Sequence, residues 1–270
     1  MNKQFPKIVL SGATGGIGES IAVALDQEGY ALLVTGRSEE KLKRLLYKLK
    51  GEQHQYVVAD LITSEGIAAL KAAANDFGAN GVINCLGINE LATLDDIAGE
   101  AISQMLSTNL LAPINICQAL IPLLEEQREG VIINVGSVLG SIGYAGSSVY
   151  CASKFGLRGF TESLRRELSD SNISVIYLAP RATNTELNTD AMNKMNQELG
   201  NALDEPVIVA KQILKALGEG KSVNRYLGWP ESFFVRLNSL FPSVVDKALA
   251  KQLPTIRRYC GENKAVKNSI

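Results

Sequence analysis

The sequence predicts an α/β protein in which a doubly wound parallel sheet carries helices on both faces and a helical extension follows at the C-terminus. Three observations lead to this fold class. Short apolar runs alternate with longer stretches of helical periodicity through residues 1–228. These runs lack the polar alternation of a half-exposed strand, so they indicate fully buried strands. A glycine-rich turn joins the first run to the first helix, and polar residues follow the other runs.

The elements follow one another as βαβ units, whose strands pair in parallel. An apolar strand at 7–10 precedes a helical pattern over 17–28, and a strand at 31–35 precedes a helix over 38–50. Ser38 is the expected N-cap of that helix, because acidic residues fill the first turn behind it. The same alternation predicts strands at 55–59, 81–84, 131–135, 173–178 and 223–227, and helices at 64–77, 102–126 and 148–168.

Composition excludes some classes of function. The net charge of −1 and a pI near 6.0 argue against general attraction to nucleic acid or anionic membranes. The chain has one histidine, His54, and four widely spaced cysteines without a ligand pattern. We therefore expect no metal site and no Ser-His-Asp triad.

The start of the chain lacks the long apolar core of a signal peptide, and no run of eighteen apolar residues occurs. A reduced cytoplasmic setting is the resulting expectation.

The carboxyl ends of the predicted strands carry most of the informative residues. Parallel strands end at one edge of a sheet, where doubly wound folds bind their ligands. Each residue also has an ordinary interpretation as a turn, a cap or a solvated charge. Six separate explanations of this kind, one for each of six strand ends, are less probable than one shared site. The residues at these ends are Gly12, Thr14, Arg37, Asp60, Leu61, Asn84, Gly87, Ser137 and Pro180.

The turn Ser11–Gly18 (SGATGGIG) lies between a strand and a helix, which is the context of a phosphate site. Bare backbone at Gly12, Gly16 and Gly18 can approach a pyrophosphate, and the following helix offers free amides and the positive end of its dipole. We therefore expect a dinucleotide.

Arg37 after the second strand predicts which dinucleotide binds. An acid at this point would hydrogen-bond a ribose 2′-hydroxyl, whereas an arginine favours a 2′-phosphate. The nearest acids, Glu39 and Glu40, fall inside the next helix. NADP is favoured over NAD.

Ser137, Tyr150 and Lys154 form a candidate proton-transfer site. If the segment from Val149 is helical, Tyr150 and Lys154 lie one turn apart on the same face. An ammonium beside a phenol lowers the phenol pKa, and a serine hydroxyl from the preceding loop can hydrogen-bond a substrate oxygen.

Taken together, these residues resemble the short-chain dehydrogenase/reductase family, in its single-domain Rossmann-type form, over about residues 5–228. The turn 11–18 is similar to the family's TGxxxGIG motif, with serine in first place. Asp60 matches the adenine-contacting aspartate, and Asn84 and Gly87 keep the first and last letters of NNAG. Asn109, Ser137, Tyr150 and Lys154 match the catalytic asparagine, serine and YxxxK.

The resemblance implies hydride transfer between a nicotinamide and a carbonyl or alcohol, and it gives these residues their roles. Tyr150 would be the general acid, Lys154 would bind the nicotinamide ribose, and Ser137 would polarise the carbonyl. Asn109 would bend its helix and hold a water of a proton relay. The expected cofactor contacts are Gly12, Thr14, Gly16, Ile17, Gly18, Arg37, Asp60, Leu61, Asn84, Gly87, Tyr150, Lys154, Pro180, Thr183 and Thr185.

Arg181 departs from the family, which usually has glycine after this proline. It removes easy access to positive φ and introduces a cation near the cofactor or the substrate mouth. Two interpretations stay open: a contact to an anionic group, or a solvent-exposed side chain. Cys85 and Leu86 are expected to pack beneath the cofactor.

Residues 186–200 fall where the family has a mobile substrate lid. Apolar residues at helical spacing, among them Met192 and Met195, would give a lid helix one hydrophobic face. Val138, Leu139 and Tyr144 would form the wall opposite that face. A hydrophobic ketone or 3-oxoacyl-type substrate is favoured over a sugar, although the stripe could equally pack on the domain.

Residues 229–260 predict two amphipathic helices bracketed by prolines, and residues 261–270 a disordered tail. The extension could pack over the substrate mouth or a neighbouring subunit, lie on a membrane surface through 229–253, or bind another protein. The resemblance implies a homodimer or homotetramer that pairs through helices near 100–126 and 148–168. A non-catalytic NADP sensor acting through the C-terminal helices is the alternative function.

Overall fold

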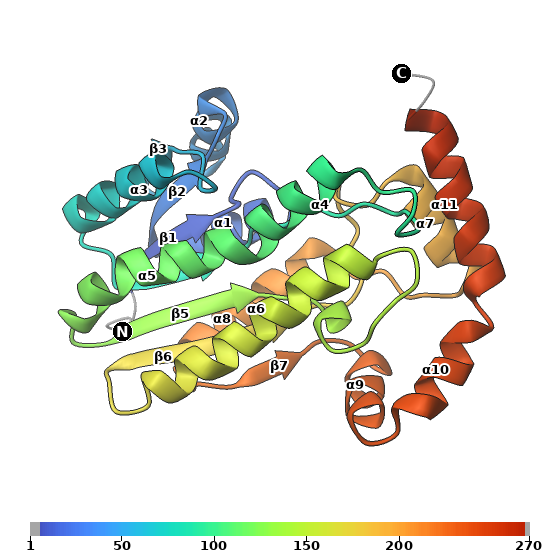
Figure 1. Ribbon diagram of the computed structural model, residues 1–270. Coiled ribbons are helices and arrows are strands. Elements are labelled where there is room, and N and C mark those ends of the chain that lie inside the picture. Colours follow the sequence, from blue (N-terminus) through green and yellow to red (C-terminus); the bar gives the residue numbers. More distant parts are fainter. Residues whose placement is uncertain (1–5, 268–270) are drawn as a thin grey trace.

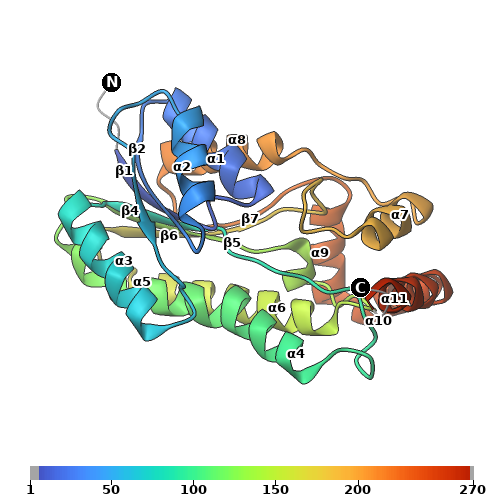
Figure 2. The same ribbon diagram turned by 90° about the horizontal axis from the view of Figure 1, so that it is seen from above.

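The computed structural model describes residues 6–267, with side chains described for residues 6–262. Seven parallel strands form one sheet in the order β3-β2-β1-β4-β5-β6-β7 (Figures 1 and 2). Because the order runs in opposite directions from β1 and from β4, the predicted doubly wound, Rossmann-type α/β fold is confirmed. The strands are β1 (Lys7–Ser11), β2 (Ala31–Gly36), β3 (Gln55–Val58), β4 (Gly81–Asn84), β5 (Gly130–Val135), β6 (Ile173–Ala179) and β7 (Asn224–Tyr226).

Helices cover both faces of this sheet, as Figure 2 shows from above. One face packs on α1 (Gly16–Gln27), α2 (Glu39–Lys48) and α8 (Pro206–Glu219). The other packs on α3 (Ser64–Phe77), α5 (Ala112–Glu125) and α6 (Ser148–Glu167). Successive strand residues alternate between these two cores: Ile8 is buried in the first and Val9 in the second.

The expected helix over 102–126 is observed as three joined segments. These are α4 (Gly99–Leu106), a π-helical turn (Ser107–Leu111) and α5. A π-helical turn inside an α-helix is a local widening that often marks a functional position. Here it contains Asn109, the residue predicted to bend this helix.

The run Gly99–Glu125 is also the one described helix long and apolar enough, by length and composition alone, to cross a membrane. Ile116, Cys117, Leu120 and Leu124 on it are 0 to 1% exposed and pack in the core under the sheet. Packing in the core therefore accounts for its apolar character.

Two helices were not predicted, and one expectation was wrong. The helix predicted in the expected lid, residues 186–200, is α7 (Asp190–Glu198). Helix α8 follows that region and was not predicted. After α9 (Glu231–Leu240) and α10 (Pro242–Ala250), a third C-terminal helix, α11 (Leu253–Lys267), runs past Gly261. The expectation of disorder from residue 261 is corrected for 261–267, and residues 268–270 lie outside the described residues.

A chain of buried hydrogen bonds crosses the carboxyl half of the sheet. The Ser11 hydroxyl donates to Asn84 Oδ1 at 3.2 Å, and Asn84 Nδ2 donates to Asn134 Oδ1 at 2.9 Å. Asn134 Nδ2 then donates to the Thr161 hydroxyl of α6 at 2.9 Å. All four side chains are fully buried, so β1, β4, β5 and α6 are held in one register.

The only histidine is part of a second buried polar cluster. The His54 ring lies 2.9 Å from Asp26 Oδ1 through Nε2, while its Nδ1 accepts from Leu32 N–H at 3.2 Å. The Asp26 carboxylate also accepts from the backbone amides of Lys50 and Gly51, each at 2.9 Å. Burial alone would raise the pKa of Asp26, but these hydrogen bonds outweigh it and hold the pKa below its usual value.

We expect Asp26→Ala to lower the free energy of unfolding by about 3 kcal/mol, because two partly buried amides and the buried His54 ring lose their acceptor. Urea denaturation followed by circular dichroism measures this. Glu52→Ala, on the exposed loop nearby, is the matched control and should stay close to wild type. A loss for Asp26→Ala no larger than that of the control would contradict this account.

Candidate active site

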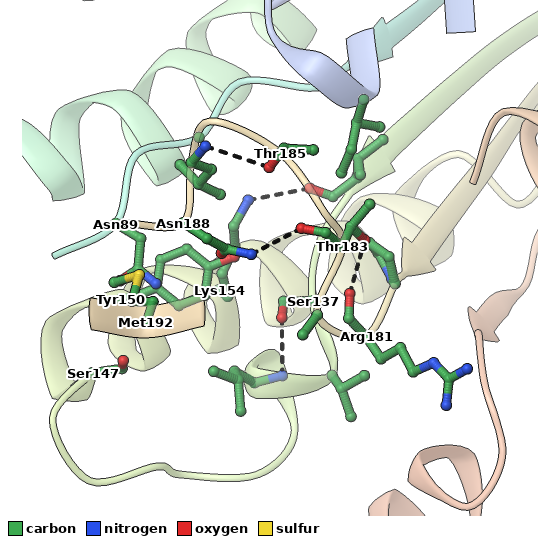
Figure 3. A pocket seen from close by; sticks show the side chains of 18 of the residues that line it. Asn89, Ser137, Ser147, Tyr150, Lys154, Arg181, Thr183, Thr185, Asn188 and Met192 are labelled. Carbon is green, nitrogen blue, oxygen red and sulfur yellow. Dashed lines mark hydrogen bonds between the residues drawn. The ribbon is translucent and has the colours of Figure 1, made fainter. Parts of the chain in front are cut away.

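A cavity of about 520 Å³ opens at the carboxyl edge of the sheet. The glycine turn after β1, the loops after β4, β5 and β6, and helices α6 and α7 contribute to its wall. Figure 3 shows Tyr150 and Lys154 of α6 side by side in this pocket, with Asn89, Asn188 and Met192 around them.

The glycine turn is packed too tightly for side chains. Gly12 has φ +71°, and a Cβ there would lie 2.6 Å from the Cys85 carbonyl oxygen. A Cβ on Gly18 would lie 2.0 Å from the Gly12 carbonyl oxygen. Glycine is therefore required at both positions, which brings β4 and the start of α1 close to the turn.

The N-terminus of α1 lies at the cavity with no side chain capping it. The first amides of a helix have no partner within the helix, and the dipole makes this end positive. Gly16, Ile17 and Gly18 line the cavity here, so the end of α1 fits a phosphate group.

Tyr150, Lys154 and Ser137 are all nearly buried, with 7%, 3% and 9% exposure. Lys154 Nζ donates to the carbonyl oxygens of Val135 and Leu86, at 3.2 and 3.5 Å, and lies 5.8 Å from the centroid of the Tyr150 ring. The Ser137 hydroxyl accepts from Leu139 N–H at 3.1 Å and so caps the short 3₁₀ helix Val138–Gly140.

Burial governs both titrating groups. It raises the pKa of Tyr150 to about 12, although the adjacent Ser137 hydroxyl acts in the opposite direction. It lowers the pKa of Lys154 to about 8. The sequence predicts a lowered phenol pKa, but the net shift is upward, because burial dominates and the Lys154 ammonium is directed at carbonyl oxygens.

Asn109 lies beneath the cavity and does not line it. Its Nδ2 donates to the Ile88 carbonyl oxygen at 2.9 Å, and its Oδ1 accepts from Ile88 N–H at 2.8 Å. Nδ2 also reaches the Ser153 hydroxyl at 3.1 Å, which in turn donates to the Tyr150 carbonyl oxygen at 2.7 Å. Asn109 thus fixes the loop after β4 against the turn of α6 that carries Tyr150.

Most of the predicted site residues line this cavity, but four of the predicted cofactor contacts do not. Asn84 is a fully buried member of the chain across the sheet, so its side chain supports the site from below and does not face a cofactor. Asp60, Leu61 and Arg37 lie outside the cavity wall, at the ends of β3 and β2. The predicted residues that line the cavity are Gly12, Thr14, Gly16, Ile17, Gly18, Gly87, Ser137, Val138, Leu139, Tyr144, Tyr150, Lys154, Pro180, Thr183, Thr185, Met192 and Met195.

Arg37 is exposed and extends from the end of β2, next to the glycine turn. Gly36 before it lies near the Thr14 hydroxyl, 3.7 Å from where a Cβ would be. Lys41, one turn into α2, does line the cavity and was not singled out from the sequence. The two cations therefore flank the end of the cavity that the turn forms.

Arg181 has a partner that neither interpretation of the sequence anticipated. Its guanidinium pairs with Asp204 at 2.7 Å and Glu231 at 3.2 Å, and donates to the Trp229 carbonyl oxygen at 3.2 Å. In Figure 3 the side chain points away from Tyr150 and Lys154. Arg181 therefore ties the segment after β6 to the start of α9. Gly228, with φ +88°, leaves room for it, since a Cβ there would lie 2.7 Å from Arg181 Cδ.

The α7 side of the cavity combines apolar and amide groups. Met192 and Met195 are buried against Leu91 and against Ile256 of α11, so α11 packs behind α7. Phe234 and Leu249 of the C-terminal helices also reach the wall. The amides among the lining residues, none of which was predicted, are Asn89, Asn188, Asn196 and Asn201. The excess of asparagine in 188–201 is the signal that could have found the last three.

Comparison with known proteins supports an assignment by family. The family model for short chain dehydrogenase matches residues 6–196. An uncharacterized oxidoreductase of Staphylococcus saprophyticus is 32% identical over 236 residues, which cover 83% of this chain and 96% of the relative. Carbonyl reductase family member 4 of Danio rerio is 34% identical over 181 residues, covering 66% and 76%.

Among solved structures, a 3-ketoacyl-(acyl-carrier-protein) reductase from Brucella melitensis, complexed with NADH, has a TM-score of 0.77 at 23% identity. The similarity covers 84% of this chain and 98% of that one, and at this identity it shows the fold. With the family model spanning the glycine turn and both Tyr150 and Lys154, this chain belongs to the short-chain dehydrogenase family of oxidoreductases.

Proposed function

We propose that the protein is an NADP-dependent carbonyl reductase or alcohol dehydrogenase acting on a largely apolar substrate. The observation that carries this proposal is the convergence of Ser137, Tyr150 and Lys154 in one cavity with the uncapped N-terminus of α1. A phosphate-binding helix end and a proton donor at opposite parts of one cavity suit a long cofactor beside a small substrate.

A nicotinamide dinucleotide fits the residues present. The cofactor would supply a hydride to carbon when bound. Gly16, Ile17 and Gly18 would hold its pyrophosphate through their amides, and Lys154 would bind its nicotinamide ribose hydroxyls. Thr183 and Thr185 line the facing wall, where a Cβ on Gly16 would lie 2.8 Å from Thr185 Cγ2. This close approach favours glycine where the backbone meets the cofactor.

The side chains around the reacting carbonyl then have distinct roles. The Tyr150 hydroxyl, protonated at neutral pH because burial raises its pKa to about 12, donates its proton to the substrate oxygen. Ser137 orients that oxygen by hydrogen bonding. Lys154 carries the positive charge that stabilises the phenolate as it forms. Asn109 acts as a positioning residue through Ile88 and Ser153.

The preference for NADP rests on Arg37 and Lys41. Arg37 is exposed, and among residues 6–262 no hydrogen bond or ion pair engages its guanidinium. No acid directly follows β2, and the acids in the first turn of α2, Glu39 and Glu40, are paired with Lys43 and Arg44. The two cations therefore favour a ribose that carries a phosphate.

The substrate class follows from the α7 side of the cavity. Val138, Leu139, Met192 and Met195 favour an apolar body. Asn89 Oδ1 is buried without a hydrogen-bond partner within the described part of the chain. A buried acceptor of this kind favours a ligand that brings a donor, such as a hydroxyl or an amide N–H. A medium-chain ketone or 3-oxoacyl compound with such a group satisfies both demands.

We also propose that subunits pair through the outer face of α5 and α6. Leu111, which directly precedes α5, and Phe155 of α6 are 50% and 41% exposed, and an interface over this face would cover both side chains. A homodimer through this face would leave the cavity and the C-terminal helices uncovered.

The first experiment tests the reaction itself. We expect the purified protein to oxidise NADPH with medium-chain ketones faster than with ketoses. Tyr150→Phe should lower kcat about a thousandfold while the KM for NADPH stays within twofold, because only the proton donor is lost. Tyr144→Phe, also in the wall, is the matched control for the loss of a hydroxyl. Binding of NADPH without any turnover across a broad carbonyl panel would contradict the proposal and favour a non-catalytic NADP sensor.

The second prediction concerns pH. Because burial lowers the pKa of Lys154 to about 8, this group is charged below that pH and loses its charge above it. We expect kcat/KM for reduction to fall tenfold per pH unit above about 8. Lys154→Arg, even if slow, should show no such limb, since arginine keeps its charge. A flat wild-type profile up to about pH 10 would contradict the role given to Lys154.

The third prediction addresses the choice of cofactor. Arg37→Asp should shift the ratio of kcat/KM for NADPH over NADH by about a hundredfold toward NADH, because a charge-assisted contact is replaced by repulsion. Arg44→Asp, on the helix that follows Arg37 and paired with Glu40, controls for a general change of surface charge. An equal shift of this kcat/KM ratio in both variants would contradict a specific role of Arg37 in the choice of cofactor.

A further inference from the structure

The outer side of the α9–α10 helical hairpin carries an exposed apolar surface. In Figure 1 this hairpin forms the lower right corner of the molecule, beyond the carboxyl edge of the sheet. We call its apolar residues the hairpin patch. They are Trp229, Phe233, Phe234, Leu240, Phe241 and Val244, with exposures of 74, 47, 42, 72, 57 and 54%. Isolated exposed apolar side chains are ordinary, but a group of this size in one short stretch marks an interaction surface.

The inner side of the same hairpin is already occupied. Val235 of α9 and Val245 of α10 are buried against Val138 and Ile142 beside the cavity. Asn238 Nδ2 donates to the Ser141 carbonyl oxygen at 2.9 Å. Since the hairpin is anchored through this side, the hairpin patch is left facing outward.

Basic residues share the outward side with the patch. On α9, Arg236 lies three residues after Phe233 and four before Leu240, which places all three on one face. On α10, Lys247 follows Val244 by three residues. Lys251 follows Lys247 by four and continues the same face.

These basic side chains are available for binding. Arg236, Lys247 and Lys251 are exposed, and within the described side chains no ion pair or hydrogen bond engages them. Asp246, the one acid of α10, falls on another side of the helix, because it is two residues from Val244 and one from Lys247. The outer side therefore combines aromatic and aliphatic groups with three cations, against one exposed acid, Asp246, on α10.

We propose that the hairpin patch docks on the surface of an anionic lipid bilayer. Helices that lie in a membrane interface combine aromatic and aliphatic residues with lysine and arginine in this way, and the cations add attraction to anionic headgroups. A second copy of the chain is the less suitable occupant. A two-fold interface through this face would set each group of three cations against its own copy.

The position of the patch gives docking a consequence for substrate access. Phe234 belongs to the patch and also lines the cavity, and Leu249 of α10 lines it as well. An apolar substrate dissolved in the bilayer would reach the cavity along the hairpin without crossing water. This step alone rests on the proposed function.

Trp229 makes docking directly measurable, because it is the only tryptophan in the chain. We expect the full-length protein to sediment with vesicles that contain phosphatidylglycerol, and its tryptophan emission to shift to the blue as the ring leaves water. Vesicles of phosphatidylcholine alone should bind it more weakly, and added salt should weaken binding to the anionic ones. Neither readout depends on catalysis, so failure of the reductase assay leaves the result intact.

Two variants and a control define the surface. Leu240→Glu combined with Phe241→Glu should abolish sedimentation and the emission shift. Lys247→Gln combined with Lys251→Gln should weaken binding to anionic vesicles about fivefold per cation removed. Tyr47→Glu, which exchanges a 92% exposed side chain on α2, should bind as wild type. Circular dichroism of each variant checks the fold.

Two outcomes would overturn the proposal. One is wild-type protein that neither sediments nor changes its emission with anionic vesicles. The other is a self-association seen by size-exclusion chromatography with light scattering that Leu240→Glu with Phe241→Glu dissolves, because a second copy would then cover the patch.

Discussion

The buried hydrogen bonds from Ser11 through Asn84 and Asn134 to Thr161 are the constraint on which the site depends. Each of these four side chains is bonded to its neighbour in the series, and each is out of reach of water. A slip of one residue in β4 or β5 would leave these groups unpaired, at a cost of about 1–3 kcal/mol each. These hydrogen bonds therefore fix the register of the strand ends. They also fix the position of α6, which carries Tyr150 and Lys154, relative to those ends.

Local patterns in the sequence were sufficient for most of the sheet. Buried parallel strands are continuous apolar runs ended by polar or glycine residues, and the strands at 81–84 and 131–135 were recognised on that basis. Helix α8 also had a readable pattern, with Pro206 at its start and Val209, Ile213 and Leu217 at helical spacing. Nevertheless, no element is predicted between the expected lid, which ends at residue 200, and the strand at 223–227.

The remaining differences come from tertiary structure that sequence separation hides. Asn84 was expected at a cofactor because it ends a strand, yet a fully buried strand gives no periodicity that tells which way its last side chain faces. Arg181 pairs with Asp204 and Glu231, and no local rule links residues 23 and 50 positions apart. The disposition of Lys154 toward carbonyl oxygens is likewise set by β4 and β5, far from it in sequence.

Arg181 connects two parts of the cavity wall that lie far apart in the sequence. The family model ends at residue 196, whereas Glu231, Phe234 and Leu249 from later in the chain complete the cavity wall. The Arg181–Glu231 ion pair thus links the segment after β6 to the C-terminal helices that complete the cavity wall. If α9 had two positions of different affinity for a ligand in the cavity, linkage would make the ligand shift α9 by the same factor by which α9 changes the affinity. The C-terminal helices would then be a place where a partner could change ligand binding, and not only part of the wall.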